Sequence, residues 1–202
     1  IASMENLSEL GINVICYNFM PILDWTRTEL AAPMSSGATA MYFDLLDFIA
    51  FDCFILERMD AQNDYEKQLV DKAKHRFEGF SKEKKLILSK NITAGLPGAG
   101  ETLTFQEVKR RLEVYSGIDA DKLRDNFKYF LDAVVPTAEK LGVRLCCHPD
   151  DPPWPLLGLP RIMSTEEDYN WLVNVHPSKA NGITFCTGSL GTSFENDLPG
   201  MV

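Results

Sequence analysis

The chain has 202 residues, of which 45% are hydrophobic and 24% charged, and these proportions are typical of a globular domain. A chain of this length buries about 70% of the surface that its unfolded form exposes, so it needs no disulfides to form a core. The net charge of −9 argues against a nucleic-acid partner, because phosphate backbones bind surfaces rich in Lys and Arg. The one dense basic stretch, residues 82–90, is typical of a solvated helix face.

Cysteine usage and hydropathy indicate a cytoplasmic protein without a membrane partner. The number of cysteines is odd and four lie in apolar runs, which indicates free thiols in a reducing compartment. No apolar run approaches the roughly 20 residues that span a bilayer, and the first residues do not resemble a signal peptide. The five positions are Cys16, Cys53, Cys146, Cys147 and Cys186.

Both ends of the sequence look cut, so we expect a fragment. The chain begins with Ile1, inside a helical pattern of apolar residues that Gly11 ends. The last residues, 198–202, stop where a new helix is expected to begin.

A helix, a glycine and a short apolar strand recur along the chain. After Gly11, the β-branched run 12–16 has the length and composition of a strand. In the next unit, Asp119 is expected to cap a helix that ends at Gly142. A strand over residues 143–147 follows it.

A third helix–strand unit completes the pattern that predicts the fold class. Its helix is expected to begin at Ser164 or Thr165, because Ser164-x-x-Glu167 has the form of a capping box. Gly182 then precedes a strand over residues 183–186. Strands that alternate with helices predict an α/β protein with a parallel sheet, and both a barrel and an open doubly wound sheet fit this pattern.

A helical insertion around residues 60–117 separates the first two units of a single domain, 1–202. The apolar run 41–58 before it is expected to be a buried helix, although its start also fits a strand. Residues 95–100 are expected to be a loop rather than a phosphate site, because no strand precedes their glycines. The helices expected in this region cover 65–79, 81–92 and about 104–117.

Two ligand-type residues follow neighbouring strands in the predicted sheet. His148 comes directly after the second strand, and Cys186 ends the third strand one unit later. Functional groups gather at the carboxyl ends of parallel strands, and imidazole and thiolate are good ligands for transition metals. Asp150 and Asp151 are candidates to accept a hydrogen bond from the second imidazole nitrogen. A His that packs its own loop and a buried structural Cys remain the alternatives.

The sequence resembles the mannonate dehydratase family. The matching blocks are CYNFMPILDWTRTEL, GLPG, HPDDPPWPLLGLPRI, GITFCTGSLG and NDLPGM. The resemblance implies a TIM (β/α)8 barrel of the xylose-isomerase-like group, incomplete in this chain, and a bound Mn²⁺ or Fe²⁺. It also implies that His148 and Cys186 are metal ligands, while further ligands and the catalytic acid and base are expected outside this chain.

The implied activity is the dehydration of D-mannonate to 2-keto-3-deoxy-D-gluconate in glucuronate catabolism, by a homo-oligomer. In this hypothesis the proton on C2 is removed, a divalent cation stabilises the negative charge beside the carboxylate, and an acid protonates the leaving C3 hydroxyl. Asn18, Asp150 and Arg161 are chosen by position as substrate or outer-shell contacts. The segment 24–27 is equally consistent with a carboxylate-binding loop and a plain surface loop.

Two other functions fit the same residues. A metal-dependent aldose–ketose isomerase uses the same kind of barrel, and a non-catalytic metal- or sugar-acid-binding module would bind metal without turnover. An assay of mannonate against free aldoses separates the two enzymes. Metal binding without turnover by the full-length protein would identify the module.

Overall fold

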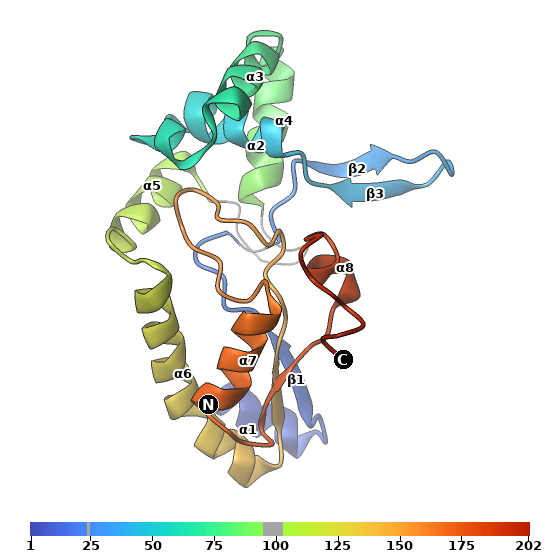
Figure 1. Cartoon of the computed structure of the whole chain (residues 1–202), viewed down its shortest axis with the longest axis vertical. Helices are drawn as coiled ribbons and strands as arrows, with labels where there is room; N and C mark the ends of the chain where they lie inside the picture. The colour runs from blue at the N-terminus through green and yellow to red at the C-terminus, as the bar shows by residue number, and fades with distance from the viewer. Residues whose placement is uncertain (24, 95–102) are drawn as a thin grey trace. The chain divides into compact units, whose positions relative to one another are not determined.

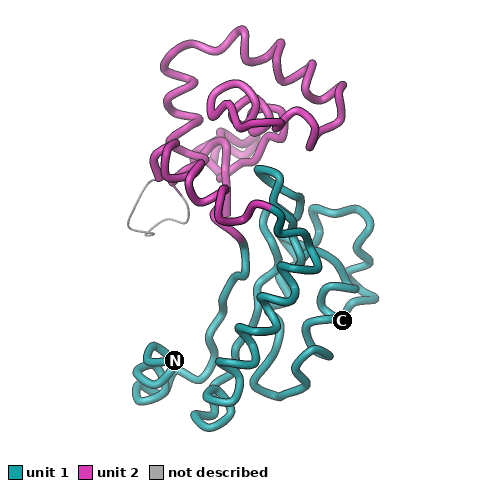
Figure 2. Tube along the Cα trace, turned by 90° about the vertical axis from the view of Figure 1, so that its left-hand side faces the viewer, with its two compact units in different colours: residues 1–20, 117–202 teal, residues 21–116 magenta. Residues whose placement is uncertain are grey.

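The computed structural model describes residues 1–23, 25–94 and 103–202. These residues form two compact units, coloured separately in Figure 2. We call residues 1–20 together with 117–202 unit 1, and residues 21–116 unit 2. The loop expected at residues 95–100 lies outside the described residues.

Unit 1 is built on a three-stranded parallel sheet, which confirms the α/β class. The strands are β1 (Val14–Tyr17), β4 (Arg144–Cys147) and β5 (Asn181–Ile183), in the order β1-β4-β5. Within the described residues these strands form an open sheet and not a closed barrel. The central strand β4 therefore fixes the positions of both neighbours.

Helices cover one face of this sheet (Figure 1). They are α1 (Ala2–Glu9), α6 (Ala120–Leu141) and α7 (Glu166–Val175), while the short α8 (Thr187–Leu190) follows β5 beyond the carboxyl end of that strand. As predicted, the Asp119 side chain caps α6 by accepting from the Lys122 N–H, and the helix ends at Gly142 with φ +67°. A positive φ is accessible to glycine without steric cost, so the stop signal has a physical basis.

The core of unit 1 lies between α6, α7 and the sheet. Phe127 of α6 is fully buried, and its ring stacks on that of Phe19 with the ring centroids 4.1 Å apart. Tyr17 and Trp171 also contact the Phe127 ring. Burial of a large aromatic side chain stabilises a fold by a few kcal/mol, so this cluster holds the end of β1 against α6.

Two details of the third unit differ from the prediction. The capping box joins Thr165 to Asp168 and not Ser164 to Glu167, because the Asp168 carboxylate also accepts the Ser164 N–H and pairs with Arg124 at 2.9 Å. The strand β5 ends at Ile183, three residues before Cys186. Its partner β4 stops at Cys147, and one further backbone hydrogen bond, from the Thr184 N–H to the Cys147 carbonyl, is the last between these two segments.

Unit 2 contains a hairpin and a group of helices. The antiparallel strands β2 (Glu29–Pro33) and β3 (Thr39–Tyr42) were not predicted as a pair. The run 41–58 is mostly helical, as expected, and continues from α2 into a π-helix. The other elements in order are α2 (Leu45–Ala50), η1 (Phe51–Ile55), η2 (Ala61–Asp64), α3 (Lys67–Glu78), α4 (Lys82–Thr93) and α5 (Phe105–Val114).

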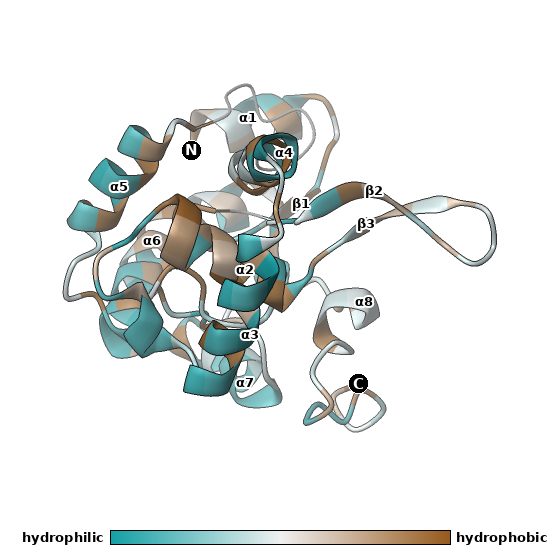
Figure 3. Ribbon diagram, turned by 90° about the horizontal axis from the view of Figure 1, so that it is seen from above, coloured by the Kyte–Doolittle hydropathy of each residue, from teal (hydrophilic) through white to brown (hydrophobic). Residues whose placement is uncertain are grey.

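The helices of unit 2 follow their sequence signals. Ser81 caps α4 by accepting from the Lys84 N–H, and Thr104 caps α5 in the same way through Glu107. Helix α5 carries both hydrophilic and hydrophobic residues (Figure 3), and Val108 on its apolar side is fully buried. In the part of the chain that the structure describes, no helix combines the length and apolar character needed to cross a membrane.

The limits of unit 2 extend beyond the expected insertion. The unit begins at Pro21, whereas the insertion was expected from about residue 60. It ends at Ser116, next to the expected limit at 117. The prediction of one domain over residues 1–202 stays a prediction.

Candidate metal centre

The three parallel strands lead polar residues to the same edge of the sheet. β1 runs into Asn18, β4 runs into His148, and the chain after β5 reaches Cys186. The pairing continues past the strand ends, because the His148 N–H donates to the Tyr17 carbonyl and the Thr184 N–H donates to the Cys147 carbonyl, both at 2.8 Å. His148 and Cys186 therefore lie at the same carboxyl edge on neighbouring segments.

The environment of His148 selects one tautomer of its ring. The side chain is buried, and Nδ1 lies 2.8 Å from the Pro149 carbonyl oxygen. A carbonyl oxygen can only accept, so Nδ1 carries the proton, and in the neutral form of the ring the lone pair is on Nε2. The Pro149 carbonyl occupies the role expected for Asp150 or Asp151 at this nitrogen. A neutral ring oriented in this way is suited to ligate a metal through Nε2.

Cys186 occupies the N-cap of the short helix α8. Burial raises the pKa of its thiol, but hydrogen bonds from the Ser189 side chain and from the N–H groups of Ser189 and Gly188 outweigh burial. The net result is a pKa below the ordinary value for cysteine. A lower pKa favours the thiolate, which is the form of cysteine that binds metals.

Ser189 links Cys186 to the loop after β4, and the sequence analysis did not identify it. Its Oγ lies 3.0 Å from Asp151 Oδ2 and 3.5 Å from Cys186 Sγ. One hydroxyl has a single proton, so at any moment Ser189 donates either to the Asp151 carboxylate or to the Cys186 sulfur. The available sequence signal was spacing, because a serine three residues after a strand-end cysteine reaches back to it within one helical turn.

Asp150 and Arg161, two of the predicted substrate contacts, are buried together. Arg161 Nη1 lies 4.0 Å from Asp150 Oδ1, and the two side chains are 3% and 1% exposed. Asp150 Oδ2 accepts the Met163 N–H at 2.7 Å and the Ser164 hydroxyl at 3.3 Å. Burial raises the pKa of Asp150 despite the nearby guanidinium. These contacts tie the strand-end loop to residues 161–164, while a role in binding substrate stays a prediction.

The remaining candidates have different surroundings. Asn18 is half-buried directly after β1. In unit 2, Arg27 donates to the Thr26 carbonyl at 3.0 Å and lies over the Trp25 ring, with 5.8 Å to the centroid. Asp24 lies outside the described residues. A carboxylate-binding role for residues 24–27 therefore stays a prediction.

The described part of the chain holds a partial donor set. It contains no group of three or more His, Cys, Asp or Glu side chains arranged to hold a metal ion.

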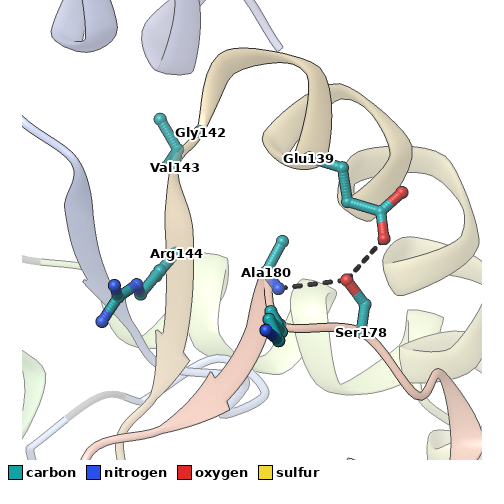
Figure 4. A pocket seen from close by; sticks show the side chains of 7 residues that line it. Glu139, Gly142, Val143, Arg144, Ser178 and Ala180 are labelled. Carbon is teal, nitrogen blue, oxygen red and sulfur yellow. Dashed lines mark hydrogen bonds between the residues drawn. The ribbon is translucent and has the colours of Figure 1, made fainter.

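A cavity of about 420 Å³ lies at the opposite edge of the sheet, beside the first residues of β4 and β5 (Figure 4). There Ser178 Oγ donates to Glu139 at 2.6 Å, and the Arg144 side chain points away from this pair. The cavity is separate from the strand-end residues.

The fold is an α/β fold with parallel strands covered by helices, and its ligand-type side chains lie at the carboxyl edge of the sheet. Proteins of this class have their active or binding sites at the carboxyl ends of the strands. The comparison with protein families is specific. The chain belongs to the D-mannonate dehydratase (UxuA) family, which it matches over residues 1–202.

Individual relatives agree with this assignment. The chain is 50% identical over 199 residues to the mannonate dehydratase of Chromohalobacter salexigens, and 49% identical over 200 residues to that of a Marinomonas species. The crystal structure of mannonate dehydratase from Streptococcus suis superposes on 99% of this chain with a TM-score of 0.64 and 30% identity. The matches cover 51% of each of the first two relatives and 43% of the solved chain. The chain thus spans about half the length of the curated relatives.

Proposed function

We propose that the whole protein to which this chain corresponds dehydrates D-mannonate to 2-keto-3-deoxy-D-gluconate in glucuronate catabolism, as a homo-oligomer. Membership of the family and 50% identity to a relative named mannonate dehydratase support the reaction. The structural observation that carries the proposal is the position of His148 and Cys186 at one carboxyl edge of the sheet.

The proposed fold of the whole protein is a TIM (β/α)8 barrel of the xylose-isomerase-like group, with unit 2 as an insertion in it. Parallel sheets are normally covered on both faces. In this chain Val14 is 57% exposed and Cys16 is also exposed, on the face of β1 that the helices leave open. Further strands from the other half of the protein would cover this face, because closing a barrel turns it inward.

The proposed cation is Mn²⁺ or Fe²⁺: imidazole suits iron, whereas Mn²⁺ would need oxygen ligands from the other half of the protein. His148 would bind through Nε2, and Cys186 through a thiolate that its hydrogen bonds favour. The bound cation would act as a Lewis acid toward the negative charge that develops beside the substrate carboxylate. We propose that further ligands and the catalytic acid and base come from the other half of the protein.

The residues around this pair have supporting roles in the proposal. The Pro149 carbonyl fixes the imidazole ring, and Ser189 holds the sulfur close to the loop that carries Asp151. The half-buried Asn18 amide would donate to a substrate hydroxyl at the same edge. Asp150 and Arg161 would keep the strand-end loop rigid, and rigid positioning accelerates a reaction by orienting its partners.

The test uses the full-length protein with His148→Ala and Cys186→Ala. Each variant is expected to lose most of its bound metal and about 100-fold or more in production of 2-keto acid from mannonate, because even the loss of an outer-shell partner of a metal ligand costs about 10–100-fold. His75→Ala, an exposed histidine of α3, is the matched control and is expected to retain both. Full metal content and full activity in both site variants would overturn the proposed centre. Turnover of free aldoses, and not of mannonate, would show that the protein is an aldose–ketose isomerase and not a dehydratase.

A further inference from the structure

The helix that begins after Cys186 is a single turn. α8 has four residues, and helices of this length are not stable by themselves, because nucleating a turn costs more than its few hydrogen bonds return. The position of Cys186 relative to His148 therefore depends on contacts that hold α8 against its surroundings.

Ser189 makes one of these contacts directly with the loop that follows His148. Its hydroxyl lies 3.0 Å from Asp151 Oδ2. A single hydrogen bond restrains one point of the helix and leaves the helix able to turn about that point. A second point of attachment is therefore needed to fix the direction of the Cys186 side chain.

Asn196 provides a second point of attachment at the end of α8. Its Nδ2 donates to the Leu190 carbonyl at 2.9 Å and to the Ser164 carbonyl at 3.0 Å. Both partners can only accept, so the amide nitrogen and not the amide oxygen faces them, and both of its protons are used. One side chain thus joins the last residue of α8 to the segment that precedes α7.

The segment that precedes α7 is in turn held to the loop of His148. The Asp150 N–H donates to the Met163 carbonyl at 2.8 Å, and Asp150 Oδ2 accepts the Met163 N–H at 2.7 Å. Asp150, Met163 and Ser164 are all buried, and hydrogen bonds are stronger in an environment of low dielectric constant. Hydrogen bonds of 3.0 Å or less therefore connect Leu190, through Asn196, to the residue two positions after His148.

We propose that Asn196 is a positioning residue of the metal centre, which fixes Cys186 relative to His148. This inference rests on the proposed function, because it presupposes these two ligands. Metal–ligand distances vary by only about 0.2 Å, so a cation shared by two segments loses affinity when either segment shifts. Asn196 acts on the two ligands through the backbone of Leu190 and Ser164, and all of these contacts lie within unit 1.

The experiment measures binding of Co²⁺ alone to the metal-free, full-length protein. Competition with a chelator gives the Kd, and the absorption band of a cobalt-bound thiolate reports ligation by Cys186. Asn196→Ala removes both donors, and Asn196→Asp places a carboxylate against the two carbonyl oxygens. We expect the Kd to rise about tenfold or more in each variant, with a weaker thiolate band, because losses around metal ligands cost about 10–100-fold in affinity.

Two control variants separate positioning from a general loss of stability. Asn174→Ala also removes an amide that donates to a backbone carbonyl, that of Asn170 at 2.7 Å, on an exposed part of α7. Thr165→Ala removes the cap of α7 directly beside Ser164. Both variants are expected to keep the Kd and the thiolate band of the unsubstituted protein, although Thr165→Ala lowers the stability of the fold.

The outcomes distinguish this inference from the metal centre itself. Loss of Co²⁺ binding in His148→Ala and Cys186→Ala, with an unchanged Kd and band in both Asn196 variants, would overturn the inference alone. Unchanged binding in His148→Ala and Cys186→Ala would overturn the metal centre and the inference with it. A rise in Kd in Thr165→Ala equal to that in Asn196→Ala would also overturn the inference.

Urea unfolding of each metal-free variant shows that the measured protein is folded. If Asn196→Asp does not fold, Asn196→Ala decides the test, because it introduces no charge beside the two carbonyl oxygens.

Discussion

The two units use buried polar groups in different ways. In unit 2 the fully buried Asp52 receives two hydrogen bonds from Arg58, at 2.9 and 2.7 Å, and one from the Tyr65 hydroxyl at 2.7 Å. In unit 1 the identified partners of His148 and Cys186 include a carbonyl, a hydroxyl and backbone N–H groups. Arg58 neutralises the charge of Asp52 within the fold. The uncharged partners of His148 and Cys186 orient these side chains and leave them able to bind a cation.

The largest effect is expected from Arg58→Ala, which tests whether the buried network of unit 2 is structural. Removing the guanidinium leaves the Asp52 carboxylate buried without its counter-ion. We expect a loss of about 3–5 kcal/mol in the free energy of unfolding, measured by urea denaturation. Arg110→Ala, which removes an exposed pair with Glu107, is the control and should have a far smaller effect, because solvent screens exposed ion pairs. Equal losses in the two variants would contradict a structural role for the buried network.

Asp150→Asn tests whether a carboxylate in unit 1 is structural in the same sense. The substitution keeps the shape of the side chain but removes the charge that faces Arg161 and replaces one of the two acceptor oxygens by an amide group that donates. We expect the protein to lose about 2–3 kcal/mol of stability, typical of hydrogen bonds to charged groups. Unchanged stability combined with lost turnover in the full-length protein would instead make Asp150 a substrate contact.

A smaller effect separates the two possible capping boxes. Thr165→Ala removes the side chain that accepts the Asp168 N–H at the start of α7. We expect a loss of about 1 kcal/mol in thermal or urea unfolding. Glu167→Ala removes the residue of the alternative box, which is exposed, and should stay within about 0.5 kcal/mol of the parent protein. A larger loss of stability in Glu167→Ala than in Thr165→Ala would instead support the capping box predicted between Ser164 and Glu167.

The smallest expected effect concerns pH and unit 2. Burial raises the pKa of Asp44, but hydrogen bonds from Arg76 and from the backbone N–H groups of Asp47 and Leu46 outweigh it and lower the pKa. The folded state then binds the proton less readily than the unfolded state, so this stability is complete above about pH 5 and is lost as the pH falls through the folded pKa.

Arg76→Ala should therefore flatten the acid side of the stability profile. The effect should stay below about 1 kcal/mol, because the pair is partly exposed to solvent. Urea unfolding at a series of pH values between neutral and about 3 measures it. An unchanged slope in the variant would show that Asp44 owes its lowered pKa to the backbone alone.

Most of the fold could be predicted where a local signal decides the structure. Asp119 and Gly142 bound α6 as expected, because a side-chain cap and a positive φ are properties of single residues. The hairpin of β2 and β3 escaped prediction, because Leu30 and Met41 are exposed and no apolar alternation marks a buried face. The limits of β5 were wrong because they depend on where its partner β4 stops.

The candidate site divides in the same way. His148 and Cys186 could be placed at one sheet edge because position after a strand is local information. The burial of Asp150 with Arg161 could not be predicted, since it depends on how the loop between them folds back. The Pro149 carbonyl was missed because backbone acceptors leave no mark in the pattern of side chains.

The strand order has a consequence for synthesis on the ribosome. Val14 of β1 pairs with Arg144 of β4, about 130 residues later, and the whole of unit 2 is translated between them. At about 5–20 residues per second, β1 leaves the ribosome roughly ten seconds before its partner exists. During that interval the nascent chain carries an apolar segment without a sheet to join, which is the kind of surface that chaperones bind.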